Sequence, residues 1–181
     1  MNWFLLGIII VTVLLIPTAY AGWIGAPYAP TRLAVVHKAF DGLGLDSEDY
    51  LVDLGAGDGG IMREAAARGM TTLGYELSPI MWLIAWVRTR RLPRSRLRYQ
   101  NFYKAKLPEQ TTVIFSFLMP THMTQVFESV ARQELPRAHY FLSYAFPVPN
   151  TEPALVVREK NCAPLYVYDL AALVSKHQKD A

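Results

Sequence analysis

Cysteine is almost absent from this chain, which carries Cys162 alone among its 181 residues. A single cysteine can form neither an intramolecular disulfide nor a thiolate metal cluster. The histidines do not supply the missing metal ligands, because His37, His139 and His177 show no ligand spacing and His122 stands by itself at a predicted helix start. The sequence therefore predicts a protein without a metal site.

Charge is missing from the N-terminal segment, where Arg32 is the first charged side chain. Residues 3–24 are almost wholly apolar, and a helix of about 20 residues rises about 30 Å, the thickness of a bilayer core. Trp3 and Trp23 would then lie at the two membrane interfaces. The alternative is a cleaved signal peptide, since residues 19–21 have the A-x-A form, but the segment lacks a basic residue at its start. The missing basic residue favours the membrane anchor.

Basic residues are distributed unevenly over the remainder. Arg32 and Lys38 follow the apolar segment, which by the positive-inside rule predicts that the C-terminal part is cytoplasmic. Six arginines fall within residues 88–98. Next to a membrane they would face anionic headgroups, and the alternative is a solvated helix end whose dipole favours arginine. The net charge of +3 is too small to require nucleic acid, and none is expected as a partner.

Apolar runs and helix-compatible stretches alternate after the N-terminal segment, and the length allows one domain. Residues 22–31 are expected to form a non-helical linker, and Thr31 to cap a helix that ends near Leu43. Predicted strands are 50–54, 71–76, 96–100, 111–118, 138–144, 154–159 and 165–169, with predicted helices at 59–68, 79–90 and 121–132. The alternation predicts a parallel sheet with helices on both faces, and the closing strand pair predicts an antiparallel hairpin at one edge.

The most informative sequence is Leu-Val-Asp-Leu-Gly-Ala-Gly-Asp-Gly-Gly, residues 51–60. It joins a predicted strand to a predicted helix through glycines with G-x-G-x-x-G spacing, namely Gly55, Gly57 and Gly60. Asp53 precedes the first glycine by two residues, where a carboxylate repels a pyrophosphate and suits a cationic amine. Glu76 ends the next strand and is well placed to accept both ribose hydroxyls. The pair favours an S-adenosylmethionine site over a nicotinamide site.

Together these features resemble the class I, seven-stranded S-adenosylmethionine-dependent methyltransferases over roughly residues 28–170. The resemblance implies a single Rossmann-like α/β domain with an antiparallel last strand. It also implies that the glycine loop holds the methionine end of the cofactor, that Glu76 holds the ribose and that Asn101 reads the adenine amino edge. The implied cofactor-binding residues are Asp53, Gly55, Ala56, Gly57, Glu76, Leu77, Asn101 and Phe102.

A narrower resemblance rests on four motifs: Pro-Tyr-Ala-Pro-Thr (27–31), Val-Asp-Leu-Gly-Ala-Gly-Asp-Gly (52–59), Gly-Tyr-Glu-Leu-Ser-Pro (74–79) and Asn-Phe-Tyr (101–103). They are similar to the ATP synthase c-subunit lysine N-methyltransferase family and its membrane-anchored prokaryotic relatives. In that family the first motif precedes a helix that covers the cofactor, which implies that its tyrosine and threonine lie near the active site. The chain departs from the family pattern in having arginine directly after the threonine, and a glycine pair where a basic residue is frequent.

Methylation of lysine requires a neutral amine, whose ordinary pKa is about 10.4. A desolvated aromatic pocket lowers that pKa. Phe117, Tyr144 and Phe146, at the ends of predicted strands, can build such a pocket, whereas Phe115 fits a core role better. No Asn/Asp-Pro-Pro-Tyr sequence is present, which argues against planar nitrogen acceptors, and no dedicated base is evident. The catalytic candidates are Tyr28, Thr31 and Phe117.

The sequence thus predicts a membrane-anchored methyltransferase acting on lysine in a membrane protein. One alternative is methylation of a lipid-soluble small molecule such as a quinone or lipid amine. Another is a non-catalytic, cofactor-binding assembly factor. A nicotinamide-binding protein is disfavoured by Asp53. The expected organisation is a transmembrane anchor (1–24), a linker and N-terminal helix (25–48) and a cofactor-binding methyltransferase domain (49–175), with the bilayer and a membrane-protein substrate as partners.

Overall fold

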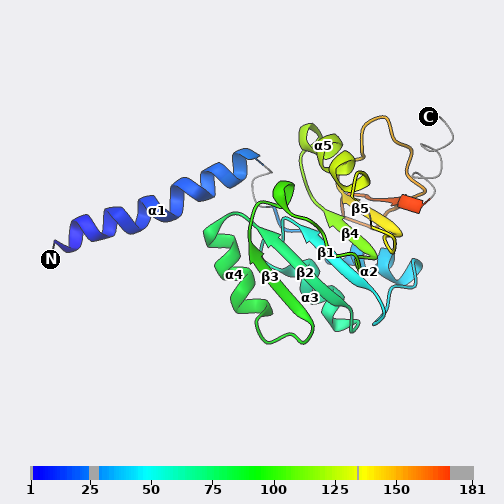
Figure 1. The fold of residues 1–181 in the computed structure, drawn as a ribbon, viewed down its shortest axis with the longest axis horizontal. Coiled ribbons are helices and arrows are strands. Elements are labelled where there is room, and N and C mark those ends of the chain that lie inside the picture. The colour runs from blue at the N-terminus through cyan, green and yellow to red at the C-terminus, as the bar shows by residue number, and fades with distance from the viewer. Residues whose placement is uncertain (1, 25–28, 134, 172–181) are drawn as a thin grey trace.

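The computed structural model describes residues 2–24, 29–133 and 135–171, and within them seven strands form one sheet flanked by helices (Figure 1). The helices are α1 (Trp3–Ile24), α2 (Leu33–Gly42), α3 (Gly60–Ala67), α4 (Pro79–Thr89), the 3-10 helix η1 (Phe102–Lys104) and α5 (Pro120–Ala131). The strands are β1 (Tyr50–Leu54), β2 (Thr71–Glu76), β3 (Ser95–Tyr99), β4 (Val113–Ser116), β5 (Tyr140–Tyr144), β6 (Leu155–Val157) and β7 (Leu165–Asp169).

The strand order is β3-β2-β1-β4-β5-β7-β6. Strands β1 to β5 run parallel, whereas β7 pairs antiparallel with both β5 and β6. The Rossmann-like sheet and the antiparallel last strand are therefore confirmed. The closing pair lies at one edge as expected, but β6 occupies the edge itself and β7 is inserted beside β5.

Alternating side chains of the strands build a core on each face of the sheet. Leu51 and Val52 are neighbours on β1, yet they belong to different apolar clusters. The cluster around Leu51 includes residues of α2 and α3, and the cluster around Val52 includes residues of α5. Helices therefore cover both faces, as the alternation of elements predicted. The central position of β1, between β2 and β4, sets its C-terminal end at the middle of the sheet, where open parallel sheets bind ligands.

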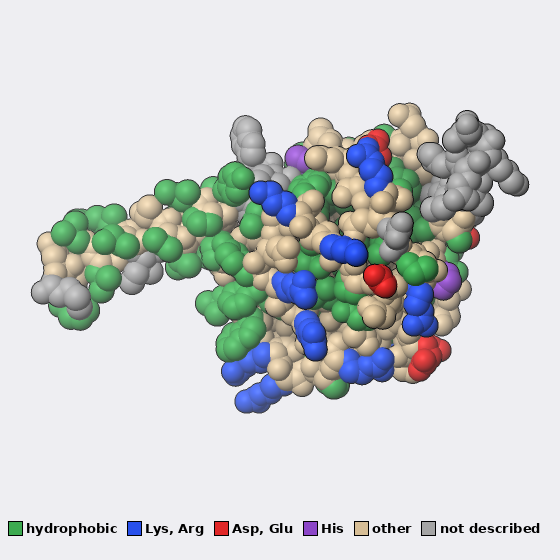
Figure 2. Space-filling view, viewed as in Figure 1, with side chains coloured by type: hydrophobic (Ala, Val, Ile, Leu, Met, Phe, Trp, Pro, Cys, Tyr) green, Lys and Arg blue, Asp and Glu red, His purple; other side chains and the backbone are tan. Residues whose placement is uncertain are grey.

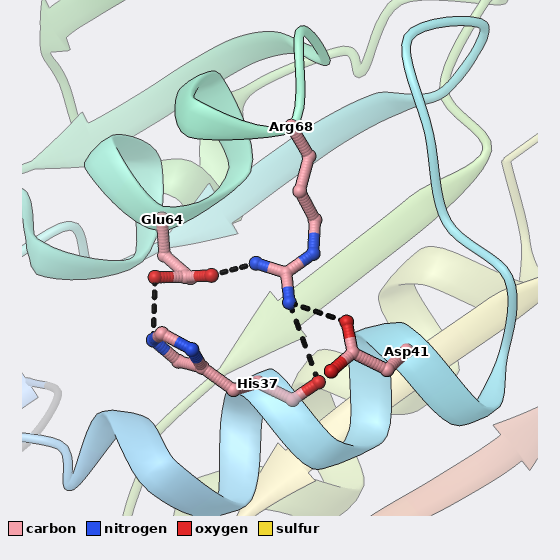
Figure 3. A network of polar contacts seen from close by, with 4 residues as sticks. All are labelled: His37, Asp41, Glu64 and Arg68. Atoms are coloured by element: carbon pink, nitrogen blue, oxygen red, sulfur yellow. Dashed lines mark hydrogen bonds and ion pairs between the residues drawn. The ribbon is translucent and has the colours of Figure 1, made fainter.

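A polar network fastens α2 to α3 (Figure 3). Glu64 Oε2 lies 2.6 Å from His37 Nε2, and its other oxygen pairs with Arg68 one turn further along α3. Arg68 Nη2 also donates to Asp41 Oδ1 at 2.6 Å and to the His37 carbonyl at 3.4 Å. Because Glu64 is buried, these contacts compensate a carboxylate that would otherwise be costly to desolvate. The network holds α2, and with it the segment that precedes α2, against the domain.

The N-terminal elements differ from their predicted bounds. Helix α1 continues to Ile24 with Pro17 inside it, so the linker expected from residue 22 starts too early. Helix α2 has Arg32 and not Thr31 at its N-cap, without a side-chain cap among the described residues. Its buried residues are Val35, Val36, Ala39 and Phe40. Leu33 and His37 of α2 are exposed.

Helix α1 is long and apolar enough to cross a membrane, with a mean hydropathy of 2.3 over Trp3–Tyr20. Length and composition alone support this, and signal sequences pass the same test. The helix projects away from the domain and touches it only near its C-terminal end among the described residues (Figure 1), where Thr18 Oγ1 lies 3.3 Å from Ser78 Oγ. Ser78 is also the N-cap of α4, so α1 and α4 meet at this point.

Candidate functional site

The glycine loop between β1 and α3 is held by the end of β2. The backbone N–H groups of Gly55 and Ala56 both donate to the Tyr75 carbonyl, at 3.0 and 2.8 Å. Gly55 and Gly57 have φ of 101° and 55°, which other residues adopt only with strain. Gly60, the third glycine of the sequence pattern, lies inside α3, and the left-handed N-cap is Gly59. The strand, glycine loop and helix follow one another as predicted, and α3 starts at Gly60, one residue later than expected.

Glu76 connects the glycine loop to the start of α4. Its Oε2 accepts from the Gly57 N–H at 2.8 Å, and its Oε1 accepts from the N–H groups of Leu77 and Ser78 at 2.9 and 2.8 Å. Burial raises the pKa of Glu76, while these three backbone donors oppose the rise. A carboxylate has about four acceptor positions, so Glu76 shapes the loop and retains capacity for a further donor.

Asp53 lies at the C-terminal half of β1 and is only 2% exposed. Its Oδ2 atom has no hydrogen-bond partner within the described part of the chain. Desolvation, followed by the nearby charges of Glu76 and Asp58, raises the pKa of Asp53 from 3.8 to about 8. A cationic group placed beside these carboxylates would reverse that shift. The site is therefore electrostatically suited to a positively charged ligand and unsuited to a pyrophosphate.

A cavity of about 770 Å³ opens beside Asp53, a volume typical of small-molecule sites. All eight residues expected to bind the cofactor line it: Asp53, Gly55, Ala56, Gly57, Glu76, Leu77, Asn101 and Phe102. Thr31 and Phe117 line it as well. Tyr28, the third catalytic candidate, lies outside the described residues. The fold therefore brings together candidate side chains that are up to 86 positions apart, between Thr31 and Phe117.

Aromatic side chains form a wall at the ends of β4 and β5, and of this wall Phe117 lines the cavity. Phe117 makes an edge-to-face contact with Tyr144, with ring centroids 4.8 Å apart, and lies 6.5 Å from Phe146. Phe115 is buried in the core cluster, as expected. The Tyr144 hydroxyl accepts from the Arg32 N–H at 3.3 Å. This hydrogen bond ties the segment before α2 to the same aromatic wall.

Two parts of the cavity wall were not predicted. Thr18 and Ala19 of α1 line it, although α1 is distant in sequence from the glycine loop. Arg88 of α4 pairs with Asp58 of the glycine loop, and both line the cavity. The sequence singled out Arg88 only as a member of the arginine-rich stretch, and nothing in the sequence indicated that it pairs with Asp58. Asp58 Oδ1 also accepts from the Gly60 N–H at 3.1 Å, at the start of α3.

Comparison with known proteins identifies the family. The family model of the ANTKMT methyltransferase domain matches residues 53–155, more than half of the chain. The chain belongs to this methyltransferase family. It is 31% identical over 152 residues to the ATP synthase c-subunit lysine N-methyltransferase of Xenopus laevis, covering 81% of this chain and 64% of that protein. It is 31% identical over 133 residues to the Homo sapiens protein of the same name, covering 71% and 55%. The chain thus spans less than two thirds of the length of these curated relatives.

Solved structures agree with the family at the level of the fold. The RNA methyltransferase from Salinibacter ruber, in complex with S-adenosyl-L-homocysteine, has a TM-score of 0.69 at 22% identity, covering 78% of this chain and 94% of that chain. A methyltransferase from Geobacter sulfurreducens, also with S-adenosyl-L-homocysteine, has a TM-score of 0.56 at 20% identity, covering 77% and 59%. The family cofactor is S-adenosylmethionine. This cavity fits it, because Asp53 Oδ2, which has no partner among the described residues, could accept from the ammonium group of the cofactor.

Proposed function

We propose that this family member is an S-adenosylmethionine-dependent protein-lysine N-methyltransferase, anchored by α1, that acts on a membrane protein. The observation that carries the proposal is the position of α1: Thr18 and Ala19, near the end of a helix long enough to span a bilayer, line the same cavity as Asp53 and Glu76. The relatives named as ATP synthase c-subunit lysine N-methyltransferases support lysine as the acceptor. The cavity and the candidate membrane span are adjacent, which suits an acceptor that is itself in the membrane.

The residues divide the cavity into a donor half and an acceptor half. On the donor side, Asp53 would pair with the ammonium group of the cofactor and Glu76 would hold its ribose, accepting from a hydroxyl at the acceptor position that remains. Asn101 Oδ1 accepts from the Tyr103 N–H at 3.0 Å, which fixes the side chain that would meet the adenine edge. Leu77 and Phe102 would flank the adenine ring. These roles are implied by the family resemblance, and the position of each residue in the cavity lining supports them.

The acceptor half would be formed by Thr31 and Phe117, with Tyr28 as a further candidate. S-adenosylmethionine supplies the electrophilic methyl group when it is bound. Transfer is an in-line displacement in which the amine nitrogen forms the new bond as the sulfur–methyl bond breaks, so positioning supplies much of the catalysis. Among the described cavity-lining residues the carboxylates are all on the donor side, so none of them would take the ammonium proton of the acceptor before attack. The aromatic wall favours the neutral amine by excluding water.

A labelling experiment tests the proposal. Purified protein is incubated with membranes from cells that lack its gene and with S-adenosylmethionine carrying a labelled methyl group, alongside the Asp53→Ala variant. We expect label in a protein band, on lysine by mass spectrometry, that is lost with the variant. Phe117→Ala should slow transfer while leaving cofactor affinity within about twofold, because Phe117 belongs to the acceptor half.

Methylation of a lipid-soluble small molecule is the second candidate, since the contact of α1 with the cavity suits such an acceptor equally well. Label in the organic extract and none in protein would decide for it. Cofactor binding by calorimetry with no label in either fraction would instead support a non-catalytic assembly factor. Both results would contradict the protein-lysine proposal.

The proposed topology places residues 1–24 across the membrane and the domain, expected over residues 49–175, on the cytoplasmic side. Arg32 and Lys38 support this orientation through the positive-inside rule. Cys162 offers a direct test because it is the single cysteine and is partly exposed. A membrane-impermeant maleimide should label it in inverted membrane vesicles and leave it unlabelled in intact cells. The reverse pattern would refute the orientation.

A further inference from the structure

Helix α4 presents large apolar side chains to solvent. Leu83, Trp86 and Val87 are 52%, 40% and 55% exposed, and Ile84 next to them is also exposed. These four residues, here called the α4 apolar face, lie at helical spacing on one side of α4, opposite the buried Ala85 and Thr89. Tyr99 of the neighbouring edge strand β3 extends the surface, through Trp82, which contacts both Trp86 and Tyr99. A contiguous apolar surface of this kind marks a site of association with a protein or a membrane.

Arginines border the α4 apolar face. Arg90 stacks over Trp86, with its guanidinium carbon 5.0 Å from the ring centroid. Two further exposed arginines follow in the turn between α4 and β3, namely Arg91 and Arg94, whereas Arg96 and Arg98 of β3 lie on the other face of the sheet, in register with Leu73 and Tyr75. No acidic residue occurs between Glu76 and Glu109, so α4, the turn after it and β3 themselves carry charge of one sign only. Figure 2 shows the apolar surface below α1, with basic side chains beneath and beside it.

The α4 apolar face lies on the side of the domain from which α1 projects (Figures 1 and 2). Helix α4 starts at the contact with α1 and runs transverse to it, so it would lie parallel to a membrane that α1 crosses. Leu83 and Val87 would then enter the interfacial region, and the arginines would meet lipid phosphates, the arrangement of amphipathic interfacial helices. The geometry and the charge therefore complement an anionic bilayer surface.

We propose that the α4 apolar face docks on the surface of an anionic lipid bilayer, as a second membrane contact besides α1. Because Ser78 and Met81, at the start of α4, line the cavity, docking would hold the cavity mouth at the membrane surface. The inference rests on α1 spanning the membrane, which belongs to the proposed function, and does not depend on which acceptor is methylated. A second copy of the chain is a poorer occupant, since a two-fold contact would bring the arginines of both copies together.

The test uses the full chain, one copy per nanodisc, with Cys162→Ser and a fluorophore attached at Val87→Cys. The matched control carries the fluorophore at Leu155→Cys, since Leu155 is a similarly exposed apolar residue (45%) on β6, at the opposite edge of the sheet. The discs contain phosphatidylcholine with phosphatidylglycerol, and a nitroxide on the acyl chain of a fraction of the lipid acts as quencher. We expect several-fold stronger quenching at position 87 than at position 155. Equal quenching at the two positions overturns the proposal.

Two further variants separate the apolar and electrostatic contributions. Leu83→Glu removes a buried leucine from the docked state and should lower the ratio of docked to undocked domain by at least about tenfold. Arg91→Glu should lower it about fivefold in anionic discs and have little effect in pure phosphatidylcholine. The fluorescence of the label at position 87 is also measured in detergent without lipid. A change in that fluorescence that grows with protein concentration would assign the face to self-association and overturn the proposal. None of these readouts requires methyl transfer, so a failed labelling experiment and a failed docking experiment are distinguishable.

Discussion

Replacing Asp53 by asparagine should stabilise the cofactor-free protein and weaken cofactor binding at the same time. The pKa of Asp53 is raised from 3.8 to about 8 in the folded chain, chiefly by desolvation. The folded state therefore holds a proton that the unfolded state has lost at every pH between these values. Unfolding then releases about one proton, and the free energy of unfolding falls by about 1.4 kcal/mol per pH unit across that window.

The magnitude follows from the width of the window. Below pH 3.8 the side chain is protonated in both states, so its contribution there is zero. At about pH 7 Asp53 lowers the free energy of unfolding by roughly 4 kcal/mol. This value is an upper bound, because relaxation of the surrounding residues reduces the cost of the buried charge. Above about pH 8 it stays constant, since the side chain is ionised in both states. The asparagine side chain of the variant cannot titrate, so the variant escapes this cost. For a chain of this length about 4 kcal/mol corresponds to roughly 10 °C in Tm.

The assay is thermal unfolding of the full chain in mild detergent, with Asp53→Asn compared with the unmodified protein over the pH window. We expect the two Tm values to coincide near pH 4 and to separate progressively up to about pH 8, with the variant higher. Added S-adenosylmethionine should raise the Tm of the unmodified protein only, because the variant lacks the carboxylate that pairs with the ammonium group. A variant that is less stable at neutral pH, or a separation that does not depend on pH, would refute the reasoning.

Three further outcomes follow from the same structure. Cofactor binding should release up to one proton from Asp53 near neutral pH, so affinity should rise by up to about tenfold per pH unit below pH 8, as measured by calorimetry in buffers of different ionisation enthalpy. Glu64→Ala should cost about 2 kcal/mol of unfolding free energy, whereas Glu128→Ala, in an exposed pair of the same spacing, should cost under about 0.5 kcal/mol in denaturant titration. Gly74→Ala should destabilise by about 1–3 kcal/mol, because a Cβ there would collide with side chains, including Ala56 at 2.9 Å, and Gly42→Ala, at an open helix position, is the control.

Sequence patterns predicted the bounds of those strands whose ends are marked by residues within or directly after the strand. The bounds of β1, β2 and β7 are as expected, because each is an apolar run that ends at a turn or a charged residue. Strand β4 is shorter than predicted. Just before it, the Thr112 hydroxyl donates to Asp49 Oδ1 at 2.7 Å, while the Thr112 backbone keeps hydrogen bonds to Tyr50 and His139. Such a side-chain hydrogen bond across 63 positions is invisible to periodicity. The same limit applies to α2, whose buried face is decided by its contact with α3.

At the candidate site, the sequence predicted residues that lie in short motifs and missed residues that arrive from elsewhere. Asp53, the glycine loop and Glu76 were recognisable because strand ends and a helix start impose fixed spacing. The cofactor roles assigned to them remain predictions. The approach of Thr18 to the cavity depends on how α1 leaves the domain, which no local pattern encodes.

The exposed surface of α4 has its origin in the glycine loop. Nearly every residue of α4 before Arg88 is apolar, so the sequence does not determine which side of the helix is buried. The choice is made by Gly59, where a Cβ would come within 2.9 Å of Thr89 Cγ2 and 3.4 Å of Ala85. Only small side chains fit against the loop at that distance, so Ala85 and Thr89 face inward and the large residues on the opposite side, Leu83 and Val87 among them, face solvent. A larger residue at position 85 would therefore disturb the cofactor loop and the apolar face together, which makes the proposed membrane contact and the cofactor site products of a single packing constraint.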